Sequence, residues 1–158
     1  MKVGNIVILA NLGELKAYEA NPRTLEAEAG LKENEVKLDL ITDKNYIESH
    51  QKLHEILSDQ AGQFKGGSQG RGSFTQGSIG EKHSIEEKIE EDLIREIAHD
   101  ISELITQKNA KSYIAIPATL FNRVMDQISA NAKEKIIKAV EKDYMKVSKG
   151  ELVELFSA

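Results

Sequence analysis

The sequence predicts an α/β fold in which helices pack on a mixed β-sheet. Three observations predict it: short strand-like segments come first, a long helical pattern follows them, and strand and helix patterns alternate over the rest of the chain. The chain of 158 residues has the usual length of one domain. We therefore expect a single domain over residues 1–158.

Three strands are expected in the first part of the chain. Residues 3–10 are dense in β-branched side chains and end at Asn11-Leu12-Gly13, which is typical of a strand followed by a tight turn. Residues 14–20 and 36–41 largely alternate polar and apolar side chains, so they are the expected second and third strands. Residues 46–57 fit neither a strand nor a clean helical stripe, and their conformation stays open.

A glycine-rich segment separates these strands from the long helix. Of the 11 glycines in the chain, seven lie between Ser58 and Gly80. A loop of this length inside a domain is usually functional or disordered, and we expect a flexible loop over residues 58–83. The helix is expected to begin at Ser84, because Ser84 and Glu87 fit a capping box. Isoleucine or leucine then recurs every fourth residue up to Ile105, as in a long amphipathic helix.

The rest of the chain alternates strand and helix patterns. Residues 112–116 form an expected strand that Pro117 ends, and residues 119–128 carry apolar side chains at helical spacing. Residues 136–140 fit a last strand, although residues 133–142 would equally continue a helix. Ser148 is expected to cap a final helix through Leu155. The order βββ-loop-αβαβα is that of ribonuclease H-like folds.

Composition excludes several classes of function. The formal charge of −5 argues against a protein that mainly grips nucleic-acid backbone, and the absence of cysteine excludes thiol chemistry. The apolar run at residues 6–10 is shorter than the roughly 7–15 residues of a signal-peptide core. No run approaches the roughly 20 apolar residues that cross a bilayer. We therefore expect a cytoplasmic protein without membrane insertion.

No motif supports a metal or cofactor site. A ribonuclease H-like nuclease needs converging carboxylates, typically one on the first strand, but Asn11 stands at the end of that strand. His50 and His54 have the i, i+4 spacing of a metal site without an HExxH pattern, so a surface pair is the simpler reading. His83 and His99 are expected to be solvated. No glycine is followed by Lys-Ser or Lys-Thr, so a Walker phosphate loop is absent.

Five segments together resemble a known family: IVILANLGELKAYEA, SDQAGQF with the later GRGS, the long helix, YIAIPATLFNRVMDQI and VEKDYMKVSKGELVELF. In this order and spacing they are similar to the bacterial host attachment protein family, whose members are described as required for attachment to host cells. The resemblance covers nearly the whole chain. Family members typically carry an aspartate where Asn11 stands and an arginine where Gln63 stands.

That family is itself similar to the middle domain of archaeal and eukaryotic peptide chain release factors. The resemblance implies a ribonuclease H-like core and a glycine-rich loop before a long helix. In release factors the loop carries Gly-Gly-Gln, which stabilises the transition state of peptidyl-tRNA ester hydrolysis. The nearest matches here are Ala61-Gly62-Gln63 and Gly66-Gly67-Ser68-Gln69, both incomplete. Gln63 and Gln69 are therefore the only candidates for such a role.

We expect a non-enzymatic binding module that engages a protein partner through this loop, without a cofactor. The expected contacts are Gly62, Gln63, Lys65, Gly66, Gly67, Gln69 and Arg71. Arg71 leads because a guanidinium among glycines reaches phosphate or carboxylate with little steric obstruction. The alternative is a translation-associated factor that binds the ribosome or tRNA, with Lys65, Arg71 and Lys82 as a local basic patch.

Overall fold

The computed structural model describes residues 1–46 and 72–157, with residues 72–83 described by their backbone alone. Five strands form one sheet in the order β3-β2-β1-β4-β5. Their bounds are β1 Ile6–Ala10, β2 Glu14–Pro22, β3 Val36–Asn45, β4 Ser112–Ala115 and β5 Ile136–Val140. The β1-β2 and β2-β3 pairs are antiparallel, and the β1-β4 and β4-β5 pairs are parallel. The expected mixed sheet is therefore confirmed.

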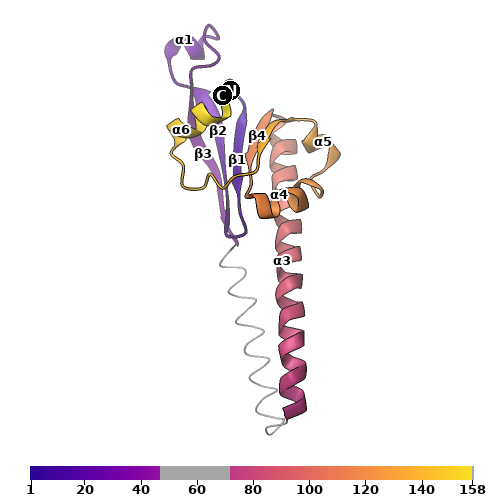
Figure 1. Cartoon of the computed structure of the whole chain (residues 1–158). Coiled ribbons are helices and arrows are strands. Elements are labelled where there is room, and N and C mark those ends of the chain that lie inside the picture. Colours follow the sequence, from indigo (N-terminus) through magenta and orange to yellow (C-terminus); the bar gives the residue numbers. More distant parts are fainter. Residues whose placement is uncertain (47–71, 158) are drawn as a thin grey trace.

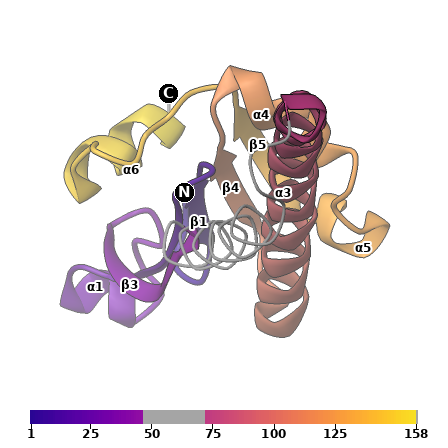
Figure 2. The same ribbon diagram turned by 90° about the horizontal axis from the view of Figure 1, so that it is seen from below.

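Helices cover both faces of this sheet. Their bounds are α1 Leu25–Glu28, α3 Gly72–Lys108, α4 Ala118–Met125, α5 Ala130–Lys133 and α6 Lys149–Ser157. Figures 1 and 2 show α3, α4 and α5 on one side of the sheet and α6 on the other. α1 belongs to a small extension between β2 and β3, at the end of the sheet where the chain begins.

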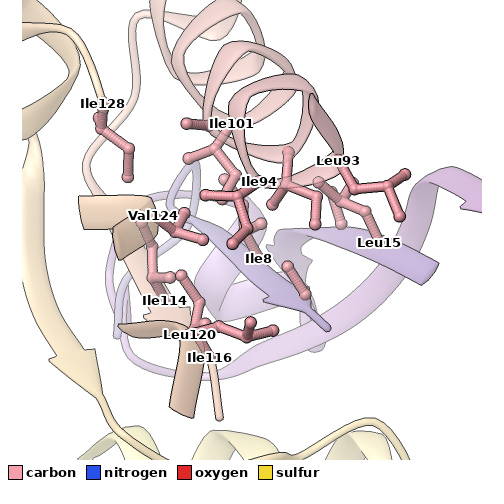
Figure 3. Packing of buried hydrophobic residues seen from close by; sticks show 14 of the residues in the cluster. Ile8, Leu15, Leu93, Ile94, Ile101, Ile114, Ile116, Leu120, Val124 and Ile128 are labelled. Atoms are coloured by element: carbon pink, nitrogen blue, oxygen red, sulfur yellow. The ribbon is translucent and has the colours of Figure 1, made fainter. Parts of the chain in front are cut away.

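The larger core lies between the sheet and α3. Strand β1 is central and wholly buried, so its apolar run serves both faces: Ile6 and Ile8 point to α3, and Val7 and Leu9 point to α6. Figure 3 shows isoleucine and leucine side chains of α3 meeting those of β1, β2, β4 and α4. The partners from α3 and α4 are Ile89, Leu93, Ile94, Ile97, Ala98, Ile101, Ile105, Leu120 and Val124, and Ile128 joins them from the segment after α4.

The second core is smaller and depends on α6. Leu152 and Phe156, four residues apart on one face of α6, are both buried against the sheet. The Phe156 ring lies 5.5 Å from the Tyr113 ring of β4 and 5.8 Å from the Tyr144 ring. The Ser148 hydroxyl accepts a hydrogen bond from the backbone N–H of Glu151 at 3.3 Å, so the expected cap of this helix is confirmed.

The start of the long helix differs from the expectation. α3 begins at Gly72, so the expected start at Ser84 is wrong, and the loop expected over residues 58–83 overlaps the helix at residues 72–83. Residues 58–71 lie outside the described residues. Glycine disfavours a helix by only about 1 kcal/mol per residue relative to alanine, so a few glycines do not by themselves prevent a helix. Ser84 and Glu87 are exposed side chains within the helix, where a Ser-x-x-Glu spacing has no capping function.

The other expected elements are present with shifted bounds: β1 begins at Ile6 rather than at residue 3, and α4 ends at Met125 rather than at residue 128. Residues 136–140 form a strand, which decides between the two alternatives for that segment. Strand β3 runs four residues beyond the expected end at Ile41. A bulge leaves Ile41 unpaired between the pairs Tyr18–Leu40 and Ala17–Thr42. This bulge breaks the polar–apolar alternation, so the pattern in the sequence stops there although the strand continues. The short helices α1 and α5 were not expected, although Thr24 and Ser129 cap them with their hydroxyls.

Candidate functional site

The loop residues singled out by the sequence cannot be compared with the structure. Gly62, Gln63, Lys65, Gly66, Gly67, Gln69 and Arg71 lie outside the described residues, as do His50 and His54. Lys82 and His83 belong to the part of α3 that is described by its backbone alone. The structure does show α3, the helix that follows this loop, and the strand β3 that precedes it.

Helix α3 is longer than its packing on the sheet requires. Its 37 residues correspond to roughly 55 Å at about 1.5 Å per residue. Among the side chains that the structure describes in this helix, those of residues 84–108, the first that packs against the core is Ile85 and the last buried one is Ile105. Figure 1 shows the first part of α3 extending well past the end of the sheet. Between Gly72 and Ile85 this extension amounts to roughly 20 Å.

A cluster of four polar side chains joins the end of β3 to the packed part of α3, between Ile85 and Ile105. We call it the root clamp: Lys44, Tyr46, Glu96 and Asp100. The Lys44 ammonium lies 2.8 Å from Glu96 Oε1 and 2.9 Å from Asp100 Oδ2, and it therefore bridges two successive turns of α3. The Tyr46 hydroxyl donates a 2.6 Å hydrogen bond to Asp100 Oδ2. The Lys44 ammonium also lies 5.3 Å from the centre of the Tyr46 ring.

In the root clamp, the Tyr46 phenol stays protonated and the Lys44 ammonium stays charged, because the pKa values of both groups are raised. Burial, the hydrogen bond to Asp100 and the nearby negative charges all raise the pKa of the Tyr46 phenol far above its ordinary value. Burial alone would lower the pKa of Lys44, but its hydrogen bonds and ion pairs with Glu96 and Asp100 outweigh burial and raise it. The clamp therefore holds a neutral phenol and a charged ammonium, which suits structural support rather than proton transfer near neutral pH.

The exposed surface of α3 is strongly acidic. Between Ser84 and Lys108 the helix carries eight acidic residues and three basic ones. The acidic residues are Glu86, Glu87, Glu90, Glu91, Asp92, Glu96, Asp100 and Glu103. The basic ones are Lys88, Arg95 and Lys108. Arg95 pairs with Asp92 at 3.2 Å. The net negative charge along this helix repels a phosphate backbone.

Asn11, where a nuclease would carry a carboxylate, has a structural role here. Its Oδ1 accepts hydrogen bonds from the backbone N–H groups of Gly13 and Glu14, both at 2.8 Å, and so closes the β1-β2 turn. Its Nδ2 donates to Asp143 Oδ2 at 3.4 Å. Among the side chains that the structure describes, those of residues 1–46 and 84–157, no three His, Asp or Glu residues gather as metal ligands would.

His99 is solvated, as expected. Its side chain is 73% exposed, and its Nε2 lies 3.5 Å from Glu103 on the next turn of α3. None of the helices in the described part of the chain combines the length and the apolar character needed to cross a membrane.

The root clamp is the feature that the sequence interpretation missed. Lys44 and Tyr46 lie beyond the expected end of the third strand, and Glu96 and Asp100 look like ordinary solvated acids of an amphipathic helix. The i, i+4 spacing of the two acids was a signal, because it puts both on one side of α3. Pairing them with Lys44 requires knowledge of how the helix lies on the sheet.

Comparison with protein families places the chain beside known sequences. The family model described as protein required for attachment to host cells matches residues 6–155. Comparison with curated proteins gives no match, and comparison with solved structures gives none. The matched range includes all five strands of the sheet and the whole of α3.

Proposed function

Because the chain belongs to the family of proteins required for attachment to host cells, we propose that it is a non-enzymatic binding module that engages a protein partner through its glycine-rich loop. The proposed contacts are Gly62, Gln63, Lys65, Gly66, Gly67, Gln69 and Arg71. Arg71 is the leading contact, for its reach toward carboxylate or phosphate. Attachment is then an indirect consequence of a cytoplasmic interaction, and this location is part of the proposal.

The observation that carries the proposal is the extension of α3. Arg71 is bonded directly to Gly72, the first residue of α3, and among the side chains described in this helix, those of residues 84–108, the core contacts begin at Ile85. The first part of α3 extends past the end of the sheet (Figure 1), so its length has a purpose other than packing on the sheet. Presenting a contact surface away from the domain is such a purpose, because binding residues are commonly held on loops by a rigid scaffold.

The sheet supports a further part of the proposal, a ribonuclease H-like fold shared with release-factor middle domains. In this sheet β1, β2 and β3 form an antiparallel meander, and β4 and β5 extend it in parallel. A ribonuclease H-like fold requires such an arrangement. The likeness concerns architecture alone, because a fold hosts many functions.

The charge of α3 favours a protein partner over nucleic acid. Over its whole length α3 carries nine acids against four bases, one of which is Lys82 itself, so RNA bound through Lys65, Arg71 and Lys82 would meet a helix of net negative charge. The alternative, a factor that binds ribosome or tRNA and uses Gln63 or Gln69 in ester hydrolysis, has to overcome this repulsion. We therefore treat this translation-factor alternative as one possible result of the co-sedimentation experiment described below, not as a second proposal.

Site-specific photo-crosslinking in cells tests the proposal. A photoreactive amino acid at Ser68, which lies among the proposed contacts without being one of them, is expected to give a discrete adduct with one protein, and Arg71→Ala is expected to weaken it. The same probe at Arg23, an exposed arginine before α1, is the control and should give no such adduct. Absence of any adduct at position 68 would refute the proposal.

Co-sedimentation with ribosomes and tRNA at low and high salt separates the alternative. Binding that is lost at high salt, and lost in the Arg71→Ala, Gln63→Ala double variant, would favour the translation factor. A matched double variant, Arg23→Ala with Gln127→Ala, changes the same residue types at exposed positions elsewhere. The protein-binding proposal expects that neither the parent chain nor either double variant sediments with ribosomes.

A further inference from the structure

We infer that the root clamp is a positioning device that fixes the direction of α3 relative to the sheet. That this direction serves the presentation of a contact surface rests on the function proposed above. That the clamp sets the direction rests only on residues 44–46 and 84–105 of the described chain.

Apolar packing alone leaves the axial position of α3 weakly defined. The hydrophobic effect is non-directional, and the buried stripe of α3 is built mainly from isoleucines repeated every four residues. Sliding the helix by one turn, about 5.4 Å, would bring similar side chains over the same part of the sheet. The apolar contacts therefore hold α3 to the sheet more firmly than they fix its register.

The clamp supplies the missing register. Lys44 contacts Glu96 and Asp100 at once, at 2.8 and 2.9 Å, and these two acids are separated by about one helical turn. A rotation of α3, or a slide that brings Leu104 toward Lys44, would break at least one of the two contacts. The opposite slide would offer Lys44 the pair Asp92 and Glu96 at the same spacing, but Asp92 already pairs with Arg95 at 3.2 Å. Both acids lie beside the apolar stripe rather than within it, so the clamp restrains the helix toward β3.

Tyr46 gives the clamp a rigid part. The residue is 0% exposed, and its hydroxyl donates a 2.6 Å hydrogen bond to Asp100. Hydrogen bonds to an ionised acceptor are stronger than neutral ones, and a packed aromatic ring has few other rotamers available. The same carboxylate therefore receives a flexible cation from Lys44 and a fixed donor from Tyr46.

The length of α3 amplifies any looseness at the clamp. Asp100 lies 28 residues after Gly72, which corresponds to roughly 42 Å of helix. A tilt of about 10° at the clamp would move the start of α3 by about 7 Å. A small change in the tilt of α3 at the clamp thus displaces Gly72 by more than the length of a side chain.

Spin labels measure this direction without any partner. The chain has no cysteine, so Lys37→Cys on β3 and Ser84→Cys on α3, both exposed, provide a unique pair of labels. Double electron–electron resonance on the full chain is expected to give one narrow distance distribution. Ser84 lies 16 residues before Asp100, which corresponds to roughly 24 Å of helix. A tilt of about 10° displaces a label at that distance by about 4 Å. In Lys44→Met and Tyr46→Phe the distance distribution should therefore broaden by roughly 4 Å.

Two further variants make the measurement decisive. Lys44→Arg keeps a cation beside both carboxylates and should keep the distribution narrow. Arg95→Met removes an exposed ion pair within α3 that does not reach the sheet, and it should have no effect. The inference is overturned if Lys44→Met and Tyr46→Phe match the parent, or if the parent is already as broad as they are. Neither result depends on whether a partner binds, so the proposed function fails or stands separately.

Discussion

The two faces of the sheet are covered by helices of very different length. α6 covers one face with nine residues, of which Leu152 and Phe156 are buried. α3 has 37 residues, and among its described side chains, those of residues 84–108, the core contacts run from Ile85 to Ile105. α6 shows how little helix is enough to close a face of a small sheet. The length of α3 therefore exceeds what covering this sheet requires.

The largest expected effect comes from the packed half of α3. Ile101 is 0% exposed and lies at the centre of the larger core (Figure 3), so Ile101→Ala should destabilise the domain by about 3–4 kcal/mol. Urea unfolding followed by circular dichroism measures this loss. Leu25→Ala, at a leucine that is 83% exposed, is the control and should change stability by less than about 0.5 kcal/mol. Equal effects of the two changes would contradict the description of the core.

A smaller loss is expected on the face that α6 covers. Phe156 is 3% exposed and packs on Tyr113, so Phe156→Ala should cost about 3 kcal/mol if α6 unfolds together with the sheet. The measurement is the same urea titration with a second probe, near-ultraviolet dichroism of the tyrosines. Two separate transitions would show that α6 detaches on its own. The two helices would then differ in how cooperatively they unfold with the sheet as well as in their length.

The sequence predicted those parts of the fold that depend on local patterns. The isoleucine repeat up to Ile105 marked the packed half of α3, and Pro117 and Ser148 marked where helices begin. It failed where the pattern was ambiguous or interrupted. The bulge at Ile41 hid the end of β3, and the start of α3 at Gly72 contradicts the low helix propensity of glycine.

The candidate site was less predictable for a different physical reason. Glycine clustering pointed to residues 62–72 because glycine permits unusual backbone geometry. The root clamp has no comparable signature, because its members come from β3 and α3, with more than fifty residues between Tyr46 and Asp100. Their meeting depends on the register of a helix on a sheet, which a single sequence does not encode in any local pattern.

The smallest expected effect concerns the clamp that joins these two elements, and it depends on pH. The pKa values of Tyr46 and Lys44 are both raised in the folded chain, above ordinary values of 10.0 and 10.5. Their stabilisation is therefore fully present below about pH 10 and is lost as pH rises further. Because Lys44 is 41% exposed, solvent screens its ion pairs, and we expect about 1–2 kcal/mol from the whole clamp. Urea titrations at pH 8 and pH 11, compared between the parent and Tyr46→Phe, measure the difference. The parent should lose more stability than Tyr46→Phe over this interval, whereas Arg95→Met should follow the parent. An identical loss in all three would mean that the clamp does not contribute to the link between β3 and α3.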